Sequence, residues 1–377
     1  MIGVEDSSPR VYSQSHSRRY LTYYVVVSGR QARNVCAEKS IAMKVKLFDK
    51  LLLFAFATVV GAQVYAQDTL SRVTVRGNLF INTPGDTLVF RGLDTSDPDK
   101  LAREGHWNEE YFSEMKRWGA NIVRFPVHPS AWRNRGQEEY LKLLDQGIAL
   151  AGKLGMYVII DWHSIGNLQT EMFQNKMYET TREETFAFWG VMAERYKDNP
   201  TVAFFELFNE PTIQGGRLGQ CSWAEWKLLM EKAIGVIRES GALTVPLVAG
   251  FNWAYDLTEA GKDPIDAPGI AYVSHPYPMK RQKPWESQWT ADWGFMAERY
   301  PLILTEIGFC GPEDRGAHVP VISDESYGDA ITAYCKAHGI SYTVWVFDPQ
   351  WSPMLINDWQ FTPTRQGKYF KAALQKK

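Results

Sequence analysis

Two glutamates, Glu210 and Glu306, follow apolar runs of the sequence and are the residues best suited to chemistry. The stretch 204–208 is mostly apolar and leads into Asn209-Glu210-Pro211, while the run 302–305 leads into Glu306. A carboxylate at the end of a buried strand is costly unless it serves a site. Two such groups can cleave a glycosidic bond when one donates a proton to the leaving oxygen and the other attacks the anomeric carbon. The two glutamates therefore indicate glycosidic chemistry, provided that the fold brings them together.

Further polar and aromatic residues occur near the ends of other apolar runs. The acid of a catalytic pair needs a raised pKa, which burial and a neighbouring like charge supply, whereas the nucleophile needs donors that keep it ionised. Arg124 and Tyr277 are the candidates for that second task. The candidate residues besides the two glutamates are Arg124, His128, His163, Asn209, His275, Tyr277 and Trp345.

Each of these residues also has a structural interpretation. Arg124 could pair with a carboxylate of the core, and His163 and His275 could be hydrogen-bonded core histidines. His128 precedes a proline and could cap a loop. We interpret three neighbours as structural: Asp161 bonded to nearby backbone, Glu206 in a second layer, and Trp162 in packing.

Strand-like and helix-like segments alternate along most of the chain. A strict alternation indicates a parallel sheet, and eight units over about 290 residues favour a closed barrel over an open, doubly wound sheet. We therefore predict an α/β fold, a single (β/α)8 TIM barrel with a short N-terminal β-hairpin that turns at 82–86. The carboxyl ends of barrel strands share one mouth, so the candidate residues would converge there. The predicted strands are 87–92, 121–127, 156–161, 202–208, 245–250, 270–274, 302–305 and 341–346, and the predicted helices are 108–118, 138–154, 181–196, 223–240, 285–300, 325–338 and 364–375.

The first predicted strand-to-helix turn argues against two other enzyme classes. Arg91-Gly92-Leu93-Asp94 lacks the GxGxxG of a dinucleotide-binding fold and the His-x-His that a metal-dependent barrel hydrolase would need. The four cysteines form no CxxC or Cys/His cluster, so we expect no metal and no cofactor. Cys310 and Cys335 could pair, but buried free thiols are the preferred interpretation.

The first 66 residues differ from the rest of the chain. Residues 43–46 are basic, an apolar run covers 51–62, and Val64-Tyr65-Ala66 offers small residues at a cleavage position. These features predict a signal peptide over 43–66 that is cleaved after Ala66, and the apolar run is short for a membrane span. Residues 1–42 are interpreted as an upstream extension, either a misassigned start or a disordered leader, with a membrane-anchored N-terminus as the alternative. The catalytic domain would then cover 67–377, and the protein would be secreted.

The charge of the predicted mature chain limits its partners. The whole chain has a net charge of −2, and residues 1–66 hold nine Lys and Arg but only four Asp and Glu, which leaves −7 for the remainder. A mildly acidic body argues against nucleic acid and anionic membranes as partners and suits a neutral polymer. We expect a monomer.

Aromatic residues are abundant, at 14% of the chain with 14 Trp. Indole rings fill cores, but they also stack on the apolar faces of sugars. We predict that Trp132, Trp253, Trp351 and Trp359 line an extended sugar cleft, while Trp289 and Trp293 pack within the protein.

Taken in order, six motifs resemble glycoside hydrolase family 5, the retaining cellulase-like barrels of clan A. They are Asn121-Ile-Val-Arg124-Phe-Pro, Asp161-Trp-His163, Asn209-Glu210-Pro211, His275-Pro-Tyr277, Thr305-Glu306-Ile-Gly308 and Trp345, within residues 70–375.

The resemblance implies a role for each of these positions. Glu210 would be the acid/base and Glu306 the nucleophile, with Arg124 and Tyr277 orienting Glu306. Asn209 would bond the sugar 2-hydroxyl. The resemblance also implies that His163 and His275 hold the sugar and the acid/base, and that Trp345 floors the subsite beside the cleaved bond. The family often has Asn where this chain has Asp94, which is a departure.

The leading expectation is thus a secreted endo-β-1,4-glucanase that acts on cellulose-like or mixed-linkage β-glucan with retention of configuration. A β-mannanase or xyloglucanase of the same family remains an alternative, because loops set that choice. From a different class, a non-catalytic carbohydrate-binding barrel remains open as well.

Overall fold

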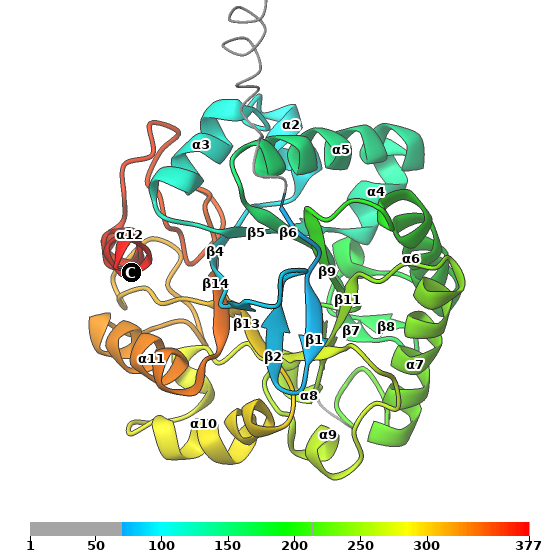
Figure 1. Cartoon of the computed structure of the whole chain (residues 1–377). Helices are drawn as coiled ribbons and strands as arrows, with labels where there is room; N and C mark the ends of the chain where they lie inside the picture. The colour runs from blue at the N-terminus through cyan, green and yellow to red at the C-terminus, as the bar shows by residue number, and fades with distance from the viewer. Residues whose placement is uncertain (1–69, 213–214, 377) are drawn as a thin grey trace, which may run out of the picture. The chain divides into compact units, whose positions relative to one another are not determined.

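Eight parallel strands close into a barrel in the computed structural model, which describes residues 70–212 and 215–376. The strands pair in chain order, and the last one pairs with the first. Figure 1 looks along the barrel, with the strands around its centre. The predicted barrel is therefore confirmed. Its strands are β4 (Arg91–Asp94), β5 (Ile122–Val127), β6 (Tyr157–Trp162), β9 (Val202–Glu206), β11 (Val245–Ala249), β12 (Ala271–Val273), β13 (Leu302–Ile307) and β14 (Ser341–Val344).

Helices surround this barrel (Figure 1). Most begin at a side chain that accepts a hydrogen bond from the first helical turn, as Asn108, Thr181 and Ser222 do. The seven predicted helices match α3 (Glu109–Arg117), α5 (Gln137–Lys153), α6 (Arg182–Tyr196), α7 (Trp223–Glu239), α10 (Glu286–Asp292) with the 3-10 turn η3 (Gly294–Glu298), α11 (Glu325–His338) and α12 (Arg365–Gln375).

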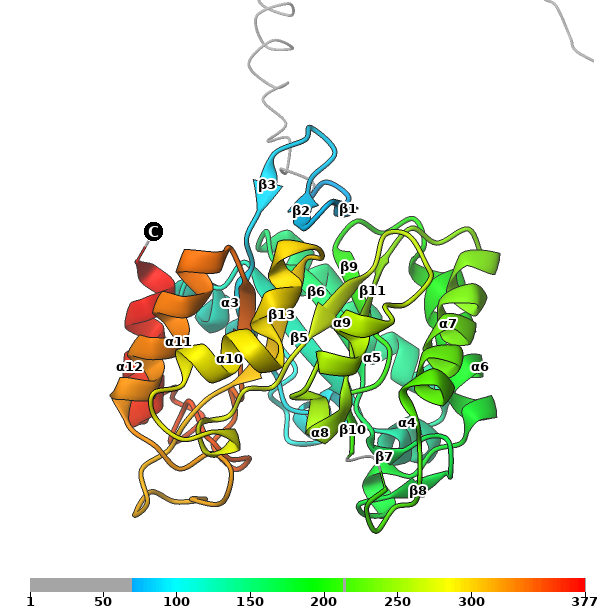
Figure 2. The ribbon, with the colours of Figure 1, turned by 90° about the horizontal axis from the view of Figure 1, so that it is seen from below.

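An antiparallel sheet covers the amino end of the barrel. It consists of β1 (Thr74–Arg76), β2 (Leu79–Ile81) and β3 (Thr87–Leu88). Phe80 of this sheet lies 5.0 Å from the ring of Phe204 and 5.6 Å from that of Phe90. Figure 2 shows the sheet at one end of the barrel and long loops at the other. Because this aromatic group fills the amino end, the carboxyl end is the one free to form a site.

Several short elements were not predicted. The predicted strand 87–92 is wrong in its bounds, since residues 87–88 belong to the covering sheet and the barrel strand runs over Arg91–Asp94. Short segments in the loops lack the periodicity that identifies longer elements. The additional elements are α2 (Pro98–Arg103), α4 (Pro129–Arg135), α8 (Phe251–Ala254), α9 (Thr258–Lys262), η1 (Lys176–Tyr178), η2 (Pro278–Lys280), and the small sheet of β7 (Ile165–Asn167), β8 (Met172–Phe173) and β10 (Glu210–Pro211).

The core accounts for most of the tryptophans and for the three cysteines that the structure describes. Trp162, Trp289 and Trp293 are fully buried, which confirms their structural interpretation. Within the described ranges, Cys221, Cys310 and Cys335 are buried free thiols, as preferred from the sequence. No helix in this part of the chain has the length and apolar character to cross a membrane. The predicted signal peptide and upstream extension lie outside the described residues.

Candidate active site

A cavity of about 650 Å³ opens at the carboxyl end of the barrel. Both catalytic candidates line it, together with other residues chosen from the sequence. This arrangement follows from the parallel strands, whose carboxyl ends share one rim. The cavity walls include His163, Tyr178, Asn209, Glu210, Trp253, Tyr277, Lys280, Glu306 and Trp345.

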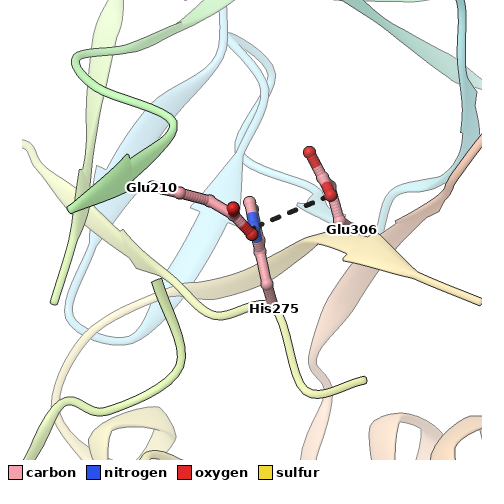
Figure 3. A group of neighbouring side chains, drawn as sticks. All are labelled: Glu210, His275 and Glu306. Atoms are coloured by element: carbon pink, nitrogen blue, oxygen red, sulfur yellow. Dashed lines mark hydrogen bonds and ion pairs between the residues drawn. The ribbon is translucent and has the colours of Figure 1, made fainter. Parts of the chain in front are cut away.

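Glu210 and Glu306 line the cavity, and the buried ring of His275 lies against both of them. One side-chain atom from each of them lies within 4.8 Å of those of the other two. The ring Nδ1 of His275 is 3.0 Å from Glu210 Oε1 and 3.8 Å from Glu306 Oε2. Figure 3 shows the three side chains pointing toward one another. The two carboxyl groups are thus close enough to reach opposite sides of a single bond.

Glu306 receives two hydrogen bonds that favour its carboxylate form. Arg124 Nη1 donates to Oε1 at 3.0 Å, and the hydroxyl of Tyr277 donates to Oε2 at 2.8 Å. The pKa of Glu306 is raised, because burial outweighs the opposing effects. Those effects are the charges of His275 and Arg124 and the hydrogen bond from Tyr277. These contacts confirm the expected placement of both donors on Glu306.

Arg124 lies fully buried in β5 and is shared among several acids. Its guanidinium bonds both oxygens of Glu206, at 2.6 and 3.1 Å, and comes within 3.0 Å of Asp161 Oδ2. Burial disfavours its charge, but these acids and Glu306 outweigh burial and raise the pKa of Arg124. Arg124 therefore pairs with core carboxylates and supports Glu306 at the same time.

Asn209 presents a defined face to the cavity. Its Oδ1 accepts a hydrogen bond from Arg124 Nη2 at 2.6 Å, so its Nδ2 points away from the arginine. Within the described residues, this buried Nδ2 has no hydrogen-bond partner. An unsatisfied buried donor beside the two candidate carboxyl groups is suited to a substrate hydroxyl.

His163 and Trp345 form one wall of the cavity. Their rings stack with centroids 5.3 Å apart and planes inclined by 4°. The Nδ1 of His163 lies 2.6 Å from Asp161 Oδ2. Asp161 therefore bonds a side chain, whereas the sequence predicted a bond to nearby backbone. Burial lowers the pKa of His163 and raises that of Asp161. Burial therefore favours the neutral form of His163, and the contact with Asp161 fixes the orientation of its ring in the cavity wall.

His275 differs from His163 in its charge. Its Nδ1 faces Glu210, and its Nε2 lies 2.9 Å from the hydroxyl of Thr305, which donates to Glu206. Both ring nitrogens are therefore placed to donate. Burial opposes the charge of His275, but Glu306, Glu206 and Glu210 outweigh burial and raise its pKa to about 10. A protonated imidazole beside Glu210 is the result at neutral pH.

This protonation argues against a metal at the same three residues. Glu210, His275 and Glu306 offer three potential ligand atoms. A metal-binding imidazole must present a lone pair, whereas His275 is positively charged. Glu306 is in addition bonded by Arg124 and Tyr277. The donor set fits acid–base chemistry better than a cation.

Asp94 is a residue whose state the sequence does not reveal. It ends β4 and is fully buried, and neither carboxyl oxygen has a hydrogen bond to a residue that the structure describes. Its Oδ2 lies 3.9 Å from Arg124 Nη1. Burial raises the pKa of Asp94 well above the usual range, although the arginine opposes this shift. Burial therefore favours the protonated form of Asp94 beneath the site.

Of the predicted cleft residues outside this centre, Trp351 and His128 lie next to it. The Trp351 ring stacks on Trp345 with centroids 6.1 Å apart, and it contacts the ring of His128 at 5.3 Å. His128 is buried and bonds Asp97 Oδ2 through its backbone N and its Nδ1, each at 2.9 Å. His128 therefore packs against Trp351 and does not line the cavity that contains Glu210 and Glu306.

Two predicted cleft tryptophans lie elsewhere. Trp132 is buried in the main core, with its ring 5.1 Å from Phe188 and 5.6 Å from Tyr140, so its assignment to the cleft is wrong. It lies on α4, a helix that we did not predict, and this helix turns it inward. Trp359 stacks on His106 at 3.8 Å and packs against the core, away from the cavity. Trp253 does line the cavity.

Comparisons with known proteins identify the family of the chain. The family description "Cellulase (glycosyl hydrolase family 5)" matches residues 81–350. An endoglucanase of Paenibacillus polymyxa is 23% identical over 382 residues, which cover 84% of this chain and 92% of that protein. Endoglucanase A of Butyrivibrio fibrisolvens is 25% identical over 286 residues, covering 73% of this chain and 59% of that protein.

A solved structure is more similar in sequence. The beta-glucanase SdGluc5_26A of Saccharophagus degradans, crystallised with cellotetraose, is 48% identical, with a TM-score of 0.80 over 81% of this chain and 94% of that one. Barrel, paired glutamates and family match together define a glycoside hydrolase. The chain belongs to glycosyl hydrolase family 5.

Proposed function

We propose that this protein is an endo-β-1,4-glucanase that cleaves its substrate with retention of configuration. The observation that supports this proposal is the close approach of Glu210 and Glu306, with Arg124 and Tyr277 both donating to Glu306. Retaining enzymes bring their two carboxyl groups within about 5–5.5 Å, whereas inverting enzymes leave room for a water between them.

In the proposed first step, Glu306 attacks the anomeric carbon and Glu210 gives its proton to the leaving oxygen. A covalent bond then joins the sugar to Glu306. In the second step, the ionised Glu210 takes a proton from water, which attacks the same carbon and releases the sugar. The free Nδ2 of Asn209 is placed to donate to the 2-hydroxyl throughout.

The glutamates of the site have matched electrostatic partners for these steps. Protonated His275 lies 3.0 Å from Glu210 Oε1 and places a positive charge beside the proposed acid/base. Arg124 and Tyr277 stabilise the charge of Glu306 before it attacks and when it leaves.

We propose β-1,4-linked glucan, cellulose-like or mixed-linkage, as the substrate. Support comes from the endoglucanases among the relatives and from the cellotetraose bound to the similar beta-glucanase. Trp345, stacked on His163, offers a flat apolar surface of the kind that binds pyranose rings.

We further propose that the enzyme is secreted after cleavage of residues 43–66, on the basis of their signal-like sequence. The test is expression of the full chain with its own leader, followed by amino-terminal sequencing of the protein in the medium or periplasm. The mature protein is expected to begin at Gln67. Retention in the cytoplasm with an uncut leader would refute this part.

The activity itself is tested with a panel of carboxymethyl cellulose, lichenan, xyloglucan and mannan, with the products sized. The expected result is reducing sugar and mixed oligosaccharides from the first two, with initial products in the β configuration. Main activity on mannan or xyloglucan would instead assign the family's other specificities. Binding without any release of reducing sugar would identify a non-catalytic barrel.

A further inference from the structure

The segment that follows β11 holds three consecutive residues in a left-handed backbone. The φ angles are 61° at Asn252, 54° at Trp253 and 53° at Ala254. Residues with a Cβ rarely adopt this conformation, and they keep it only where surrounding groups hold it in place. None of the three is glycine. Contacts from outside the segment are therefore expected to stabilise it.

Two groups do so: the backbone N–H of His275 donates to the carbonyl of Ala254 at 2.9 Å, and Lys280, at the end of η2, holds the other two residues. Its Nζ donates to the carbonyl of Asn252 at 2.8 Å and lies 3.5 Å from the carbonyl of Trp253. The same ammonium lies 5.3 Å from the centroid of the Trp253 ring. On the ring itself, Trp253 Nε1 donates to Gln174 Oε1 at 3.3 Å. The backbone and the indole are thus anchored from two different loops.

The ammonium of Lys280 has no other strong partner. Within residues 70–212 and 215–376, no carboxylate lies in ion-pair contact with it, and its hydrogen bonds go to the two carbonyls. Burial lowers the pKa of Lys280 to about 8, although Glu210 and Glu306 act in the opposite direction. A largely desolvated ammonium is costly unless its hydrogen bonds serve a purpose, and here they fix the backbone of this segment.

This segment forms one side of the catalytic cavity. Trp253 and Lys280 line the cavity together with Glu210, and α8 lies beside the short strand β10 that carries Glu210 (Figure 2). The stacked pair of His163 and Trp345 forms a separate aromatic group. An acid that protonates the leaving oxygen faces the departing part of the substrate. Trp253 therefore lies on the leaving-group side.

We propose that Lys280 is a positioning residue that holds Asn252–Ala254 in its left-handed form and thereby keeps the Trp253 indole in place to bind the departing sugar. Because this inference rests on the proposed glucanase activity, its test compares two substrates. Cellotetraose can place glucose on both sides of the cleaved bond. β-Cellobiosyl fluoride has only a fluoride ion to lose and does not use the leaving-group side.

The variants are Lys280→Met, Trp253→Ala and the double variant, with Lys283→Met as matched control. Lys283 lies three residues further along, where its exposed ammonium is 4.9 Å from the ring of Trp285. Lys280→Met and Trp253→Ala are each expected to lower kcat/KM for cellotetraose about three- to tenfold, the range of one lost aromatic contact. Hydrolysis of the fluoride should stay within about twofold, and Lys283→Met should change neither substrate.

The double variant tests whether the lysine acts through the tryptophan. Lys280→Met should have little further effect in the Trp253→Ala background, since the two changes remove the same contact. A crystal structure of Lys280→Met should show residues 252–254 leaving the left-handed region. Equal losses on both substrates, fully additive effects, or an unchanged loop would overturn the proposal. A wild-type enzyme that hydrolyses neither substrate would instead overturn the glucanase assignment on which it rests.

Discussion

His275 Nδ1 lies 3.0 Å from Glu210 Oε1, and this contact joins a positively charged imidazole to the proposed acid/base. The surrounding glutamates stabilise the positive charge of His275. Both of its ring nitrogens are placed to donate, as the protonated ring requires. This contact places a positive charge beside the group that is proposed to give and take the proton.

Glu210→Gln removes the proton donor and keeps the shape of the side chain. We expect kcat/KM on cello-oligosaccharides to fall about 10²- to 10⁴-fold, the usual contribution of a general acid. Formation of the glycosyl-enzyme from 2,4-dinitrophenyl β-cellobioside should be far less affected, because that leaving group needs no proton. Stopped-flow measurement of dinitrophenolate release checks this. An equal loss on both substrates would contradict the acid role.

Glu306→Gln should abolish the covalent intermediate. With the wild-type enzyme, 2-deoxy-2-fluoro-β-cellobiosyl fluoride is expected to add one sugar label, and peptide mass spectrometry should place that label on Glu306. The variant should take up no label, since the amide cannot attack. Labelling of Glu210 in the wild-type enzyme would reverse the two assignments.

Tyr277→Phe removes one of the two donors on Glu306. That hydrogen bond lowers the pKa of Glu306, so its loss should raise this pKa further. The nucleophile must be ionised, so the acid limb of the kcat/KM profile should move to higher pH in the variant. A hydrogen bond to a charged group is worth about 1.5–3 kcal/mol, which corresponds to roughly a tenfold to hundredfold loss at low pH. A limb that moves to lower pH would count against this assignment.

Asp94→Asn should stabilise the protein at neutral pH. The folded-state pKa of Asp94 is raised, so the unfolded chain loses its proton at about pH 4 while the folded chain keeps it. This difference reduces the stability of the wild-type protein progressively as the pH rises above about 4. The variant lacks this effect, so its advantage in Tm should grow from pH 4 to pH 8. A constant or shrinking advantage would show that Asp94 is ionised.

Trp132 and Trp351 should respond differently to replacement by alanine. Trp132 is buried in the core, so Trp132→Ala should lower the free energy of unfolding by about 3–5 kcal/mol and leave KM nearly unchanged. Trp351 packs on Trp345 at the wall of the site, so Trp351→Ala should raise KM with a smaller loss of stability. Denaturant unfolding together with kinetics on lichenan separates the two. A raised KM for Trp132→Ala would restore it to the cleft.

Helices and barrel strands could be predicted closely because their signals are local. The helix α11 begins and ends at the predicted residues, 325 and 338, since its cap Asp324 and the terminal Gly339 both lie in the sequence next to it. The apolar runs 202–208 and 302–305 predicted Glu210 and Glu306 at the ends of two strands that meet at one mouth. Parallel strands in regular alternation allow few other arrangements.

The short elements in the loops and the state of each charge could not be predicted in this way. Whether Trp132 faces the core or the cleft depends on α4, a single short helix with no distinct periodicity. The proton positions on Asp94, His163 and His275 depend on which groups surround each side chain after folding. Those neighbours come from strands far apart in the chain.

The sequence by itself determined the (β/α)8 barrel, the two glutamates and most of the residues that support them. This was possible because hydrophobic periodicity and the residue types at the strand ends can be recognised in the sequence alone. Only the tertiary structure decided that Arg124 serves Glu206 and Glu306 together, that His275 is charged, and that Lys280 contacts the segment around Trp253. Those facts depend on distances between distant segments, and burial and Coulomb forces act through such distances rather than through separation in sequence.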